Sequence, residues 1–323
     1  WAALRRKQKV TTINPNHADA HNNIVNAVKD QGRLDEASAS YGRAHAIKPD
    51  YAEAHNNLGS ALQGLGELDE AEACYRKALQ LNPLFDVPNY NLYSLLLDPV
   101  EMTPSIRCIE KVVDARPKRL DYRFILGILL DYSGKPQEAI VHFEMVERGS
   151  SLDRARIDAW RYIKSAHSKM PPMIGSSIQA LRMGIDAAVN DGLVLEFGVR
   201  FGTSIRQLAA LTTQEVHGFD SFEGIPETWN REPKGAYSTK GIIPSVPQNV
   251  TLHRGWFEET LPGFLEKHDS AVRFINIDCD IYSSTKTILE LLATRIKPGT
   301  VIVFRSEERR VGKECRSRWS PSD

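Results

Sequence analysis

The sequence has few cysteines and no long apolar run. Its four cysteines form no C-x-x-C pair, which argues against a zinc cluster or a disulfide scaffold and favours a reducing, cytoplasmic compartment. No apolar run approaches the ~20 residues that span a bilayer, so we expect no membrane segment. No secretion signal opens the chain, although a lost upstream signal stays open because the chain starts at Trp1 and not at Met.

The sequence also lacks an excess of charge of either sign. Lys and Arg together number 41, and so do Asp and Glu, so the formal net charge is zero. A neutral chain has no general electrostatic drive toward nucleic acid. The 323 residues, 41% of them hydrophobic, suffice for folded cores and predict two domains.

The first half of the chain repeats with a period of 34 residues. The positions that keep this register are prolines, glycines, alanines and aromatic residues: Pro15, Pro49, Pro83 and Pro117; Gly32, Gly66 and Gly134; Ala37, Ala71 and Ala139; Tyr41, Tyr75 and Phe143. Apolar residues within a unit recur at helical spacing, glycine supplies a turn, and the residue before each proline ends the second helix. Each unit is therefore predicted to be a pair of helices.

This pattern resembles the tetratricopeptide repeat (TPR) family over residues 1–146. A partial first unit precedes units at about 16–49, 50–83, 84–117 and 118–148, so we infer that the chain begins within a repeat and that earlier repeats are missing. The third of these units is degenerate, because Ser105 replaces the alanine and Pro99 and Pro104 interrupt the turn.

Asparagine occupies one repeat position three times, at Asn23, Asn57 and Asn91, and Ile125 ends the series. An amide both donates and accepts hydrogen bonds, and such a ladder resembles repeats that grip an extended peptide. A peptide or protein partner on the concave face is one reading. A spacer, or a packing partner for the chain's own enzyme domain, is the other.

After a linker helix within residues 147–175, short apolar runs alternate with helical stretches. The expected strands are Leu193–Phe197, Val216–Phe219, Val250–His253, Val272–Ile277 and Thr300–Phe304, and the expected helices are Ser176–Val189, Thr203–Leu211, Thr260–His268 and Ser283–Ile296. This alternation predicts an α/β Rossmann-like domain over 176–304, with a parallel sheet and ligands at the carboxyl ends of its strands.

Three polar motifs stand at the predicted strand ends. The first, E-x-G-x-x-x-G, contains Glu196, Gly198 and Gly202, and it matches neither G-x-G-x-x-G nor a phosphate-binding P-loop. In the second, Asp220 ends a strand where an acid can accept both hydroxyls of a ribose, or cap the next segment. In the third, Asp278 and Asp280 share one side of a strand end; two close carboxylates suit a hard cation such as Mg²⁺, or one of them caps a helix.

Together with G-W-F-E-E-T-L-P at 255–262, the phrases D-S-F-E-G-I-P (220–226) and I-D-C-D-I-Y-S-S-T (277–285) resemble class I S-adenosylmethionine-dependent methyltransferases, and within them the macrocin O-methyltransferase group. The resemblance covers about 174–304. It implies a cofactor site, a metal ligand and a general base. The implied cofactor residues are Glu196, Gly198, Gly202, Thr203, Asp220, Ser221, Trp256 and Phe257; the metal ligand is Asp278 and the base is Asp280.

From Arg305 the sequence departs from that resemblance, which implies one or two acids after Phe304 to complete a metal site. Residues 305–321 instead resemble the in-frame translation of a common sequencing adapter, so we interpret 305–323 as a non-native tail and the methyltransferase domain as incomplete. A natural basic tail is the alternative. We expect Arg305 to displace the cation and to leave this chain a poor enzyme.

The resemblance implies methyl transfer from S-adenosylmethionine, with Mg²⁺, to a hydroxyl of a sugar or glycan. Three other readings stay open. They are a TPR scaffold with a degenerate nucleotide-binding domain, a nicotinamide-dependent enzyme, and a methyltransferase whose acceptor is a peptide held by the repeats.

Overall fold

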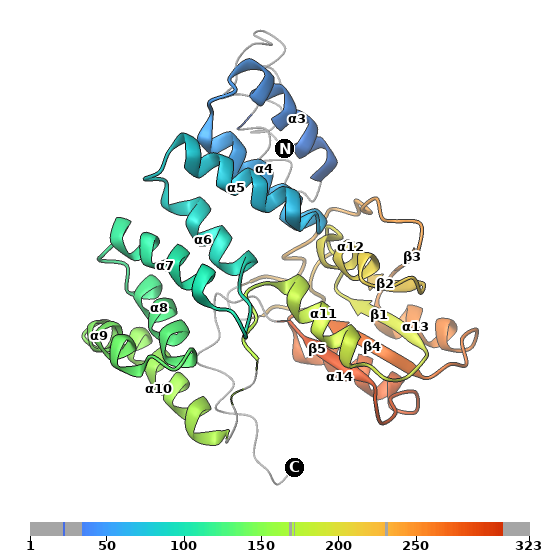
Figure 1. Cartoon of the computed structure of the whole chain (residues 1–323). Helices are drawn as coiled ribbons and strands as arrows, with labels where there is room; N and C mark the ends of the chain where they lie inside the picture. Colours follow the sequence, from blue (N-terminus) through green and yellow to red (C-terminus); the bar gives the residue numbers. More distant parts are fainter. Residues whose placement is uncertain (1–21, 23–33, 168–169, 171, 230–231, 306–323) are drawn as a thin grey trace. The chain divides into compact units, whose positions relative to one another are not determined.

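A computed structural model of the chain describes residue 22 and residues 34–167, 170, 172–229 and 232–305 (Figure 1). Asn23 of the predicted ladder and the tail beyond Arg305 lie outside the described residues. No helix among the described residues is long and apolar enough to cross a bilayer. The chain forms a helical part and an α/β part, which are described separately below.

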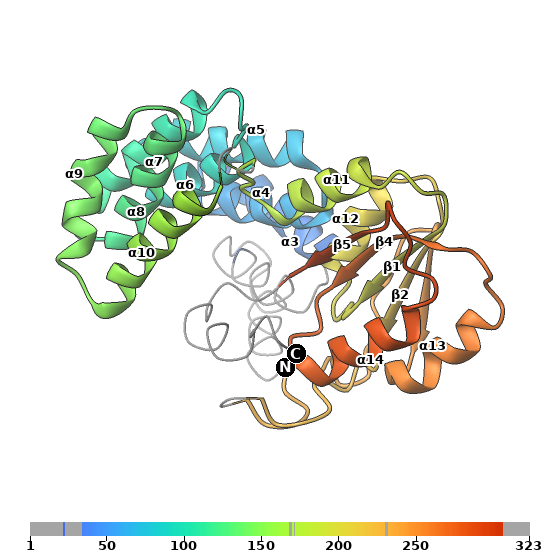
Figure 2. The same cartoon turned by 90° about the horizontal axis from the view of Figure 1, so that it is seen from below.

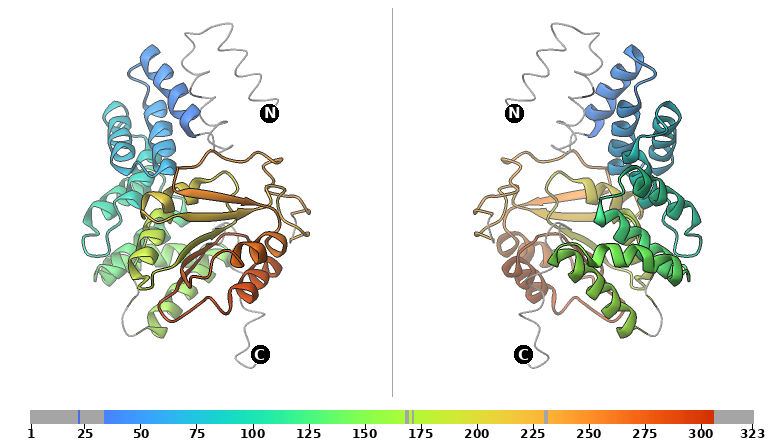
Figure 3. Two further views of the ribbon diagram at one scale, coloured as in Figure 1. Left: turned by 90° about the vertical axis from the view of Figure 1, so that its right-hand side faces the viewer. Right: turned by 90° about the vertical axis from the view of Figure 1, so that its left-hand side faces the viewer.

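The helical part is a series of helices, in which every helix from the third onward packs against the next (Figure 3). Its members are α3 (Leu34–Ile47), α4 (Ala52–Leu65), α5 (Leu68–Leu81), α6 (Asp86–Leu95), α7 (Thr103–Ala115), α8 (Leu120–Tyr132), α9 (Pro136–Glu147) and α10 (Ser151–Ala166). Gly66 and Gly134 make the turns within two of the pairs at φ of 90° and 81°, as the repeat pattern predicts.

Glycine also sets how closely paired helices approach. A Cβ atom placed on Gly59 would lie 2.7 Å from the Tyr75 ring, and one on Gly127 would lie 2.5 Å from the Phe143 ring. The aromatic residue of each unit therefore fills the space that its glycine leaves. In the degenerate unit, a connection over residues 96–102 replaces the tight turn, and Ser105 is fully buried at the alanine position.

The α/β part is a five-stranded parallel sheet with helices on both faces (Figure 2). Its elements in chain order are α11 (Ser177–Ala187), β1 (Leu193–Phe197), α12 (Thr203–Ala210), β2 (Val216–Asp220), β3 (Val250–Arg254), α13 (Phe257–Leu265), β4 (Val272–Ile277), α14 (Tyr282–Leu292) and β5 (Val301–Phe304). The strand order is β3-β2-β1-β4-β5. The predicted parallel Rossmann-like sheet is confirmed.

One apolar core lies on each face of the sheet. Leu181, Ile205 and Phe274 belong to the core beneath α11 and α12, whereas Leu261 and Ile288 belong to the core beneath α13 and α14. All five residues of β1 are buried, Glu196 among them, as is typical of a parallel strand covered by helices on both faces. The chain places β2 and β3 on one side of β1, then crosses over and adds β4 and β5 on the other side. The strand order therefore reverses between β1 and β4, which makes this a topological switch point.

Candidate functional site

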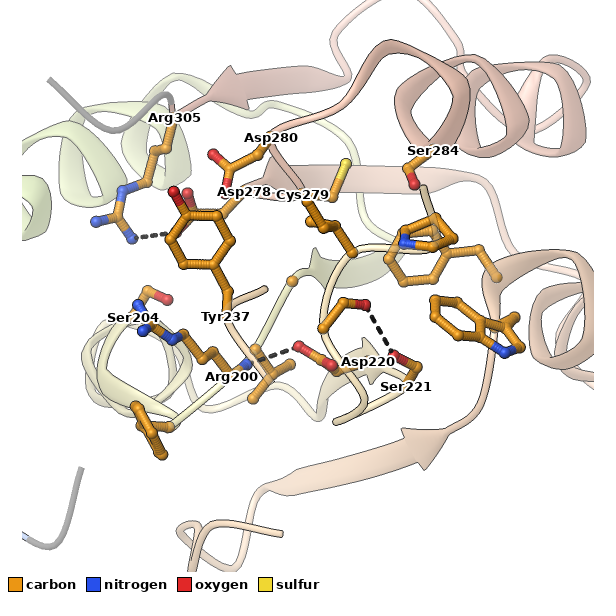
Figure 4. A pocket seen from close by; sticks show the side chains of 18 of the residues that line it. Arg200, Ser204, Asp220, Ser221, Tyr237, Asp278, Cys279, Asp280, Ser284 and Arg305 are labelled. Carbon is orange, nitrogen blue, oxygen red and sulfur yellow. Dashed lines mark hydrogen bonds and ion pairs between the residues drawn. The ribbon is translucent and has the colours of Figure 1, made fainter. Parts of the chain in front are cut away.

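A pocket of about 310 Å³ opens at the carboxyl ends of the strands, at the switch point (Figure 4). Most of the residues named by the sequence motifs line it: Gly198, Thr203, Asp220, Ser221, Trp256, Phe257, Asp278 and Asp280. The other two predicted cofactor residues, Glu196 and Gly202, do not line the pocket.

The turn between β1 and α12 passes very close to the end of β4. Gly198 has φ of 94°, and a Cβ atom on it would lie 2.2 Å from the Asp278 carbonyl oxygen. Only glycine fits there, so this residue lets the first and third motifs meet. Gly202, with φ of 80°, precedes Thr203 at the start of α12. Gly202 lies close to the connection between β2 and β3, where a Cβ atom on it would lie 3.1 Å from Pro244.

Glu196 lies beneath the pocket and not in its wall. It is fully buried and accepts hydrogen bonds from Ser204 Oγ (2.8 Å) and Asn276 Nδ2 (2.9 Å). Burial raises the pKa of this carboxyl to about 7, although the two hydrogen bonds oppose the shift. In this structure Glu196 ties β1 to α12 and β4, so any effect on a ligand passes through the elements that it holds.

Asp220 at the end of β2 holds two neighbouring loops. Its Oδ2 accepts from the backbone N–H of Arg200 at 2.7 Å, and its Oδ1 accepts from that of Phe222 at 2.6 Å. Burial raises the pKa of the carboxyl, and these hydrogen bonds pull the pKa the other way. Because a carboxylate has about four acceptor positions, the capping role leaves capacity for a hydroxyl group of a ligand.

The G-W-F segment supplies the apolar wall of the pocket. Trp256 is the N-cap residue of α13 and Phe257 is its first residue, so this helix starts three residues before the predicted Thr260. The Phe257 ring meets the Phe197 ring edge to face, with centroids 5.3 Å apart. Arg254, which ends β3 just before this segment, is not in the pocket lining.

The third motif forms an ion pair with Arg305, the residue that follows β5. Arg305 Nη1 lies 3.1 Å from Asp278 Oδ2, and both side chains are about one quarter exposed. The expected pairing of Arg305 with the acidic motif is therefore confirmed for Asp278.

Asp280 lines the same pocket with φ of 61°, a left-handed conformation that is uncommon outside glycine. Between Asp278 and Asp280, burial raises the pKa of the Cys279 thiol to about 11, so it stays protonated at neutral pH.

The motifs did not identify two further lining residues, Arg200 and Tyr237. The Arg200 guanidinium lies 5.3 Å from the centre of the Tyr237 ring. Arg200 stands at an x position of the E-x-G-x-x-x-G motif, so the glycines on either side of it already indicated a binding turn at this place. Tyr237 lies in the long connection from β2 to β3, where no periodicity or spacing distinguishes it.

Comparison with known proteins shows what each part is similar to. Residues 195–306 match the profile of a methyltransferase domain, residues 52–85 match that of a tetratricopeptide repeat, and residues 26–66 match that of a TPR repeat. A relative from Streptomyces olivaceus, 8-demethyl-8-(2,3-dimethoxy-alpha-L-rhamnosyl)-tetracenomycin-C 4'-O-methyltransferase, is 30% identical over 163 residues. The match covers 41% of this chain and 60% of the relative, so the chain spans less than two thirds of that protein.

Two solved structures resemble the helical part. The crystal structure of MamA matches with 21% identity and a TM-score of 0.40, over 50% of this chain and 90% of that chain. YrrB, described as a TPR protein with an unusual peptide-binding site, matches with 20% identity and a TM-score of 0.42, over 50% of this chain and 85% of that chain. The profile matches alone identify tetratricopeptide repeats and a methyltransferase domain in this chain, as the sequence predicts.

Proposed function

We propose that the α/β domain transfers a methyl group from S-adenosylmethionine to a hydroxyl of a sugar or glycan. The observation that carries this proposal is one pocket that joins the glycine-rich turn and Asp220 to Asp278 and Asp280. A carboxylate for a ribose and a carboxylate for a reacting hydroxyl thereby share one cavity. The relative from Streptomyces olivaceus, which by its name methylates the 4'-oxygen of a rhamnosyl group, supports a sugar acceptor.

The residues at the β1–β2 side of the pocket fit this cofactor. Asp220 keeps acceptor capacity for a ribose hydroxyl, and Trp256 offers an aromatic face that suits a purine. Gly198 and Thr203 present backbone close to the ligand at the start of α12. When bound, S-adenosylmethionine supplies a methyl group already activated on a sulfonium centre.

Because the donor is activated, the protein's task is to position the acceptor and remove its proton. We assign proton removal to Asp280, whose carboxylate accepts the proton of the hydroxyl that gains the methyl group. Asp280 lines the pocket and has a left-handed backbone at φ of 61°. The thiol of Cys279 is a poor base here, because its raised pKa makes the thiolate scarce.

The residues present do not fit the Mg²⁺ predicted at Asp278. Arg305 already pairs with Asp278, and within the part of the chain that the structure describes no group of three His, Cys, Asp or Glu residues could hold a metal ion. We therefore assign no catalytic step to a metal in this chain.

For the repeats we propose a peptide or protein partner. Of the asparagine ladder, Asn57 and Asn91 lie within the described residues. Asn91 Nδ2 donates to Asn56 Oδ1 at 3.0 Å, and Asn56 Nδ2 to Asn57 Oδ1 at 3.4 Å. The amides thus link α4 to α6, and both ladder residues remain half-exposed, which leaves a surface for a partner.

The decisive experiment measures cofactor binding and methyl transfer with the same protein. Calorimetry should detect S-adenosylhomocysteine binding and no NADH binding. Radiolabelled S-adenosylmethionine with sugar acceptors should then give slow product formation, since Arg305 lies at the acceptor side. Asp280→Asn should keep S-adenosylhomocysteine affinity and slow transfer by about 10²-fold or more. NADH binding instead would favour a nicotinamide enzyme, and binding of neither would favour a scaffold.

A further inference from the structure

The connection between β2 and β3 carries an aromatic side chain into the pocket. This connection spans residues 221–249, and Tyr237 is its aromatic residue in the pocket lining. The other lining residues follow the strand ends closely, whereas Tyr237 comes from the middle of the connection. Long connections at the carboxyl edge of such sheets commonly carry binding residues.

Hydrogen bonds hold the backbone on both sides of Tyr237. Before it, Gly235 N–H donates to the Ile225 carbonyl at 2.9 Å. After it, Gly241 N–H donates to the Phe222 carbonyl at 3.1 Å. The position of Tyr237 is therefore set by the loop itself, before any ligand is bound.

Tyr237 also holds a costly backbone conformation. Its φ is 64°, in the left-handed region that bulky residues rarely adopt. The described residues include five non-glycine residues with positive φ, and three of them, Arg200, Tyr237 and Asp280, line this pocket. Such conformations persist where the surroundings impose them, and they concentrate at binding and catalytic sites.

The side chain of Tyr237 contacts that of Arg200. The guanidinium lies 5.3 Å from the ring centre of Tyr237, within the range of a cation–π contact. In the close-up, the Tyr237 ring extends from its loop toward the side of the pocket that holds Asp278, Asp280 and Arg305 (Figure 4). This is the side that the proposed function assigns to the acceptor, opposite the residues assigned to the cofactor.

Resting on the proposed methyl transfer to a sugar, we propose that Tyr237 binds the acceptor and determines which of its hydroxyls faces Asp280. A tyrosine ring offers an apolar face to a sugar ring, and its hydroxyl can donate to or accept from a sugar hydroxyl. Fixing one part of the sugar in this way selects the hydroxyl that reaches the base.

The test compares Tyr237→Phe and Tyr237→Ala in the full chain loaded with S-adenosylhomocysteine. The probe is methyl α-L-rhamnopyranoside, with its affinity measured by ligand-observed NMR titration. Loss of one hydrogen bond should weaken sugar binding about 2- to 10-fold in Tyr237→Phe. Loss of the ring as well should weaken it by more than about 10-fold in Tyr237→Ala. The KM for sugar should rise in the same order, with affinity for S-adenosylhomocysteine unchanged.

Lys240→Ala is the matched control. Lys240 lies in the same connection with φ of 59°, is exposed and is not in the pocket lining, so its replacement should leave sugar binding unchanged. Equal sugar affinity in Tyr237→Ala and the unsubstituted chain would overturn the role of Tyr237 alone. Absence of sugar binding to the unsubstituted chain, with S-adenosylhomocysteine bound, would overturn the acceptor class and this inference with it.

Discussion

At the residue scale, Asp220 holds two neighbouring loops and is proposed to bind the cofactor, and the loss of each role can be measured separately in one variant. Asp220→Ala should weaken S-adenosylhomocysteine binding by about 1–3 kcal/mol, because it removes a charged acceptor from the expected ribose position. It should also lower the melting temperature of the ligand-free protein, because the N–H groups of Arg200 and Phe222 lose their acceptor. Calorimetry and thermal denaturation measure the two effects. Unchanged affinity in a folded variant would remove Asp220 from the cofactor site.

The pKa of His217, which lies on the face of the sheet that α13 covers, lets us predict how the stability of the fold depends on pH. His217 on β2 is buried, with its Nδ1 3.9 Å from Glu215 and 3.4 Å from His253 Nε2, and its ring contacts His268 and Phe264. Burial lowers the pKa of His217 to about 4, with His253 and His268 adding to the shift and Glu215 opposing it.

The folded state therefore resists protonation of His217 while the unfolded state takes the proton. The stability from this residue should be fully present above about pH 6.5 and should be lost as the pH falls from there toward 4, by about 1.4 kcal/mol per unit at the steepest. Denaturant unfolding at several pH values measures this loss. His217→Phe should flatten the curve, and replacement of the exposed His167 should not. A curve unchanged by His217→Phe would assign the acid sensitivity elsewhere.

At the element scale, the glycine–aromatic pairs of the repeats should tolerate no added methyl group. Gly127→Ala should destabilise the helical part by about 1–3 kcal/mol, because its Cβ would lie 2.5 Å from the Phe143 ring. Phe143→Leu in the same chain should recover part of the loss. In contrast, Gly42→Ala in α3, where no atom lies within 4 Å of the added Cβ, should gain about 0.5–1 kcal/mol from helix propensity. Equal effects of the two glycine substitutions would contradict this account of the packing.

The elements that the sequence predicts best are those with one dominant pattern. The bounds of β1 and β4 agree with the predicted strands because both are mostly apolar and almost entirely buried. Helix ends were less accurate: α14 ends at Leu292 and not at Ile296, and α13 begins at Phe257. The resemblance places Trp256 and Phe257 in the cofactor site and the predicted helix begins only at Thr260, whereas these two residues also start α13.

The site was predictable where chemistry lies next to a strand end, and less so elsewhere. Asp220, Asp278 and Asp280 line the pocket because parallel strands bring their carboxyl ends to one edge. Spacing alone could not tell that Glu196 lies beneath the pocket, since burial depends on Ser204 and Asn276 from other elements. Tyr237 was missed because loop hydrogen bonds and not sequence periodicity place it.

At the scale of the whole molecule, the pocket is lined by residues from Gly198 to Arg305. The charge of Arg305 therefore acts on carboxylates that the earlier strands bring to the pocket. Arg305 places a fixed cation 3.1 Å from Asp278 Oδ2, where a divalent ion would need the same carboxylate. The unsubstituted chain should therefore bind Mn²⁺, a paramagnetic substitute for Mg²⁺, very weakly, and EDTA should not change its S-adenosylhomocysteine affinity or its slow turnover.

Reversing that charge should create a metal site. Arg305→Asp removes the competing cation and adds a third carboxylate beside Asp278 and Asp280, the oxygen-rich setting that hard divalent ions prefer. We expect Mn²⁺ affinity, measured by electron paramagnetic resonance titration, to rise at least about 10-fold, since about 1.4 kcal/mol suffices for that factor. Arg305→Ala, which removes the cation without adding a ligand, should fall between the two, and Asp278→Asn in the Arg305→Asp chain should abolish the gain. Equal Mn²⁺ affinity in the unsubstituted and Arg305→Asp chains would show that the ion pair does not close this site to cations.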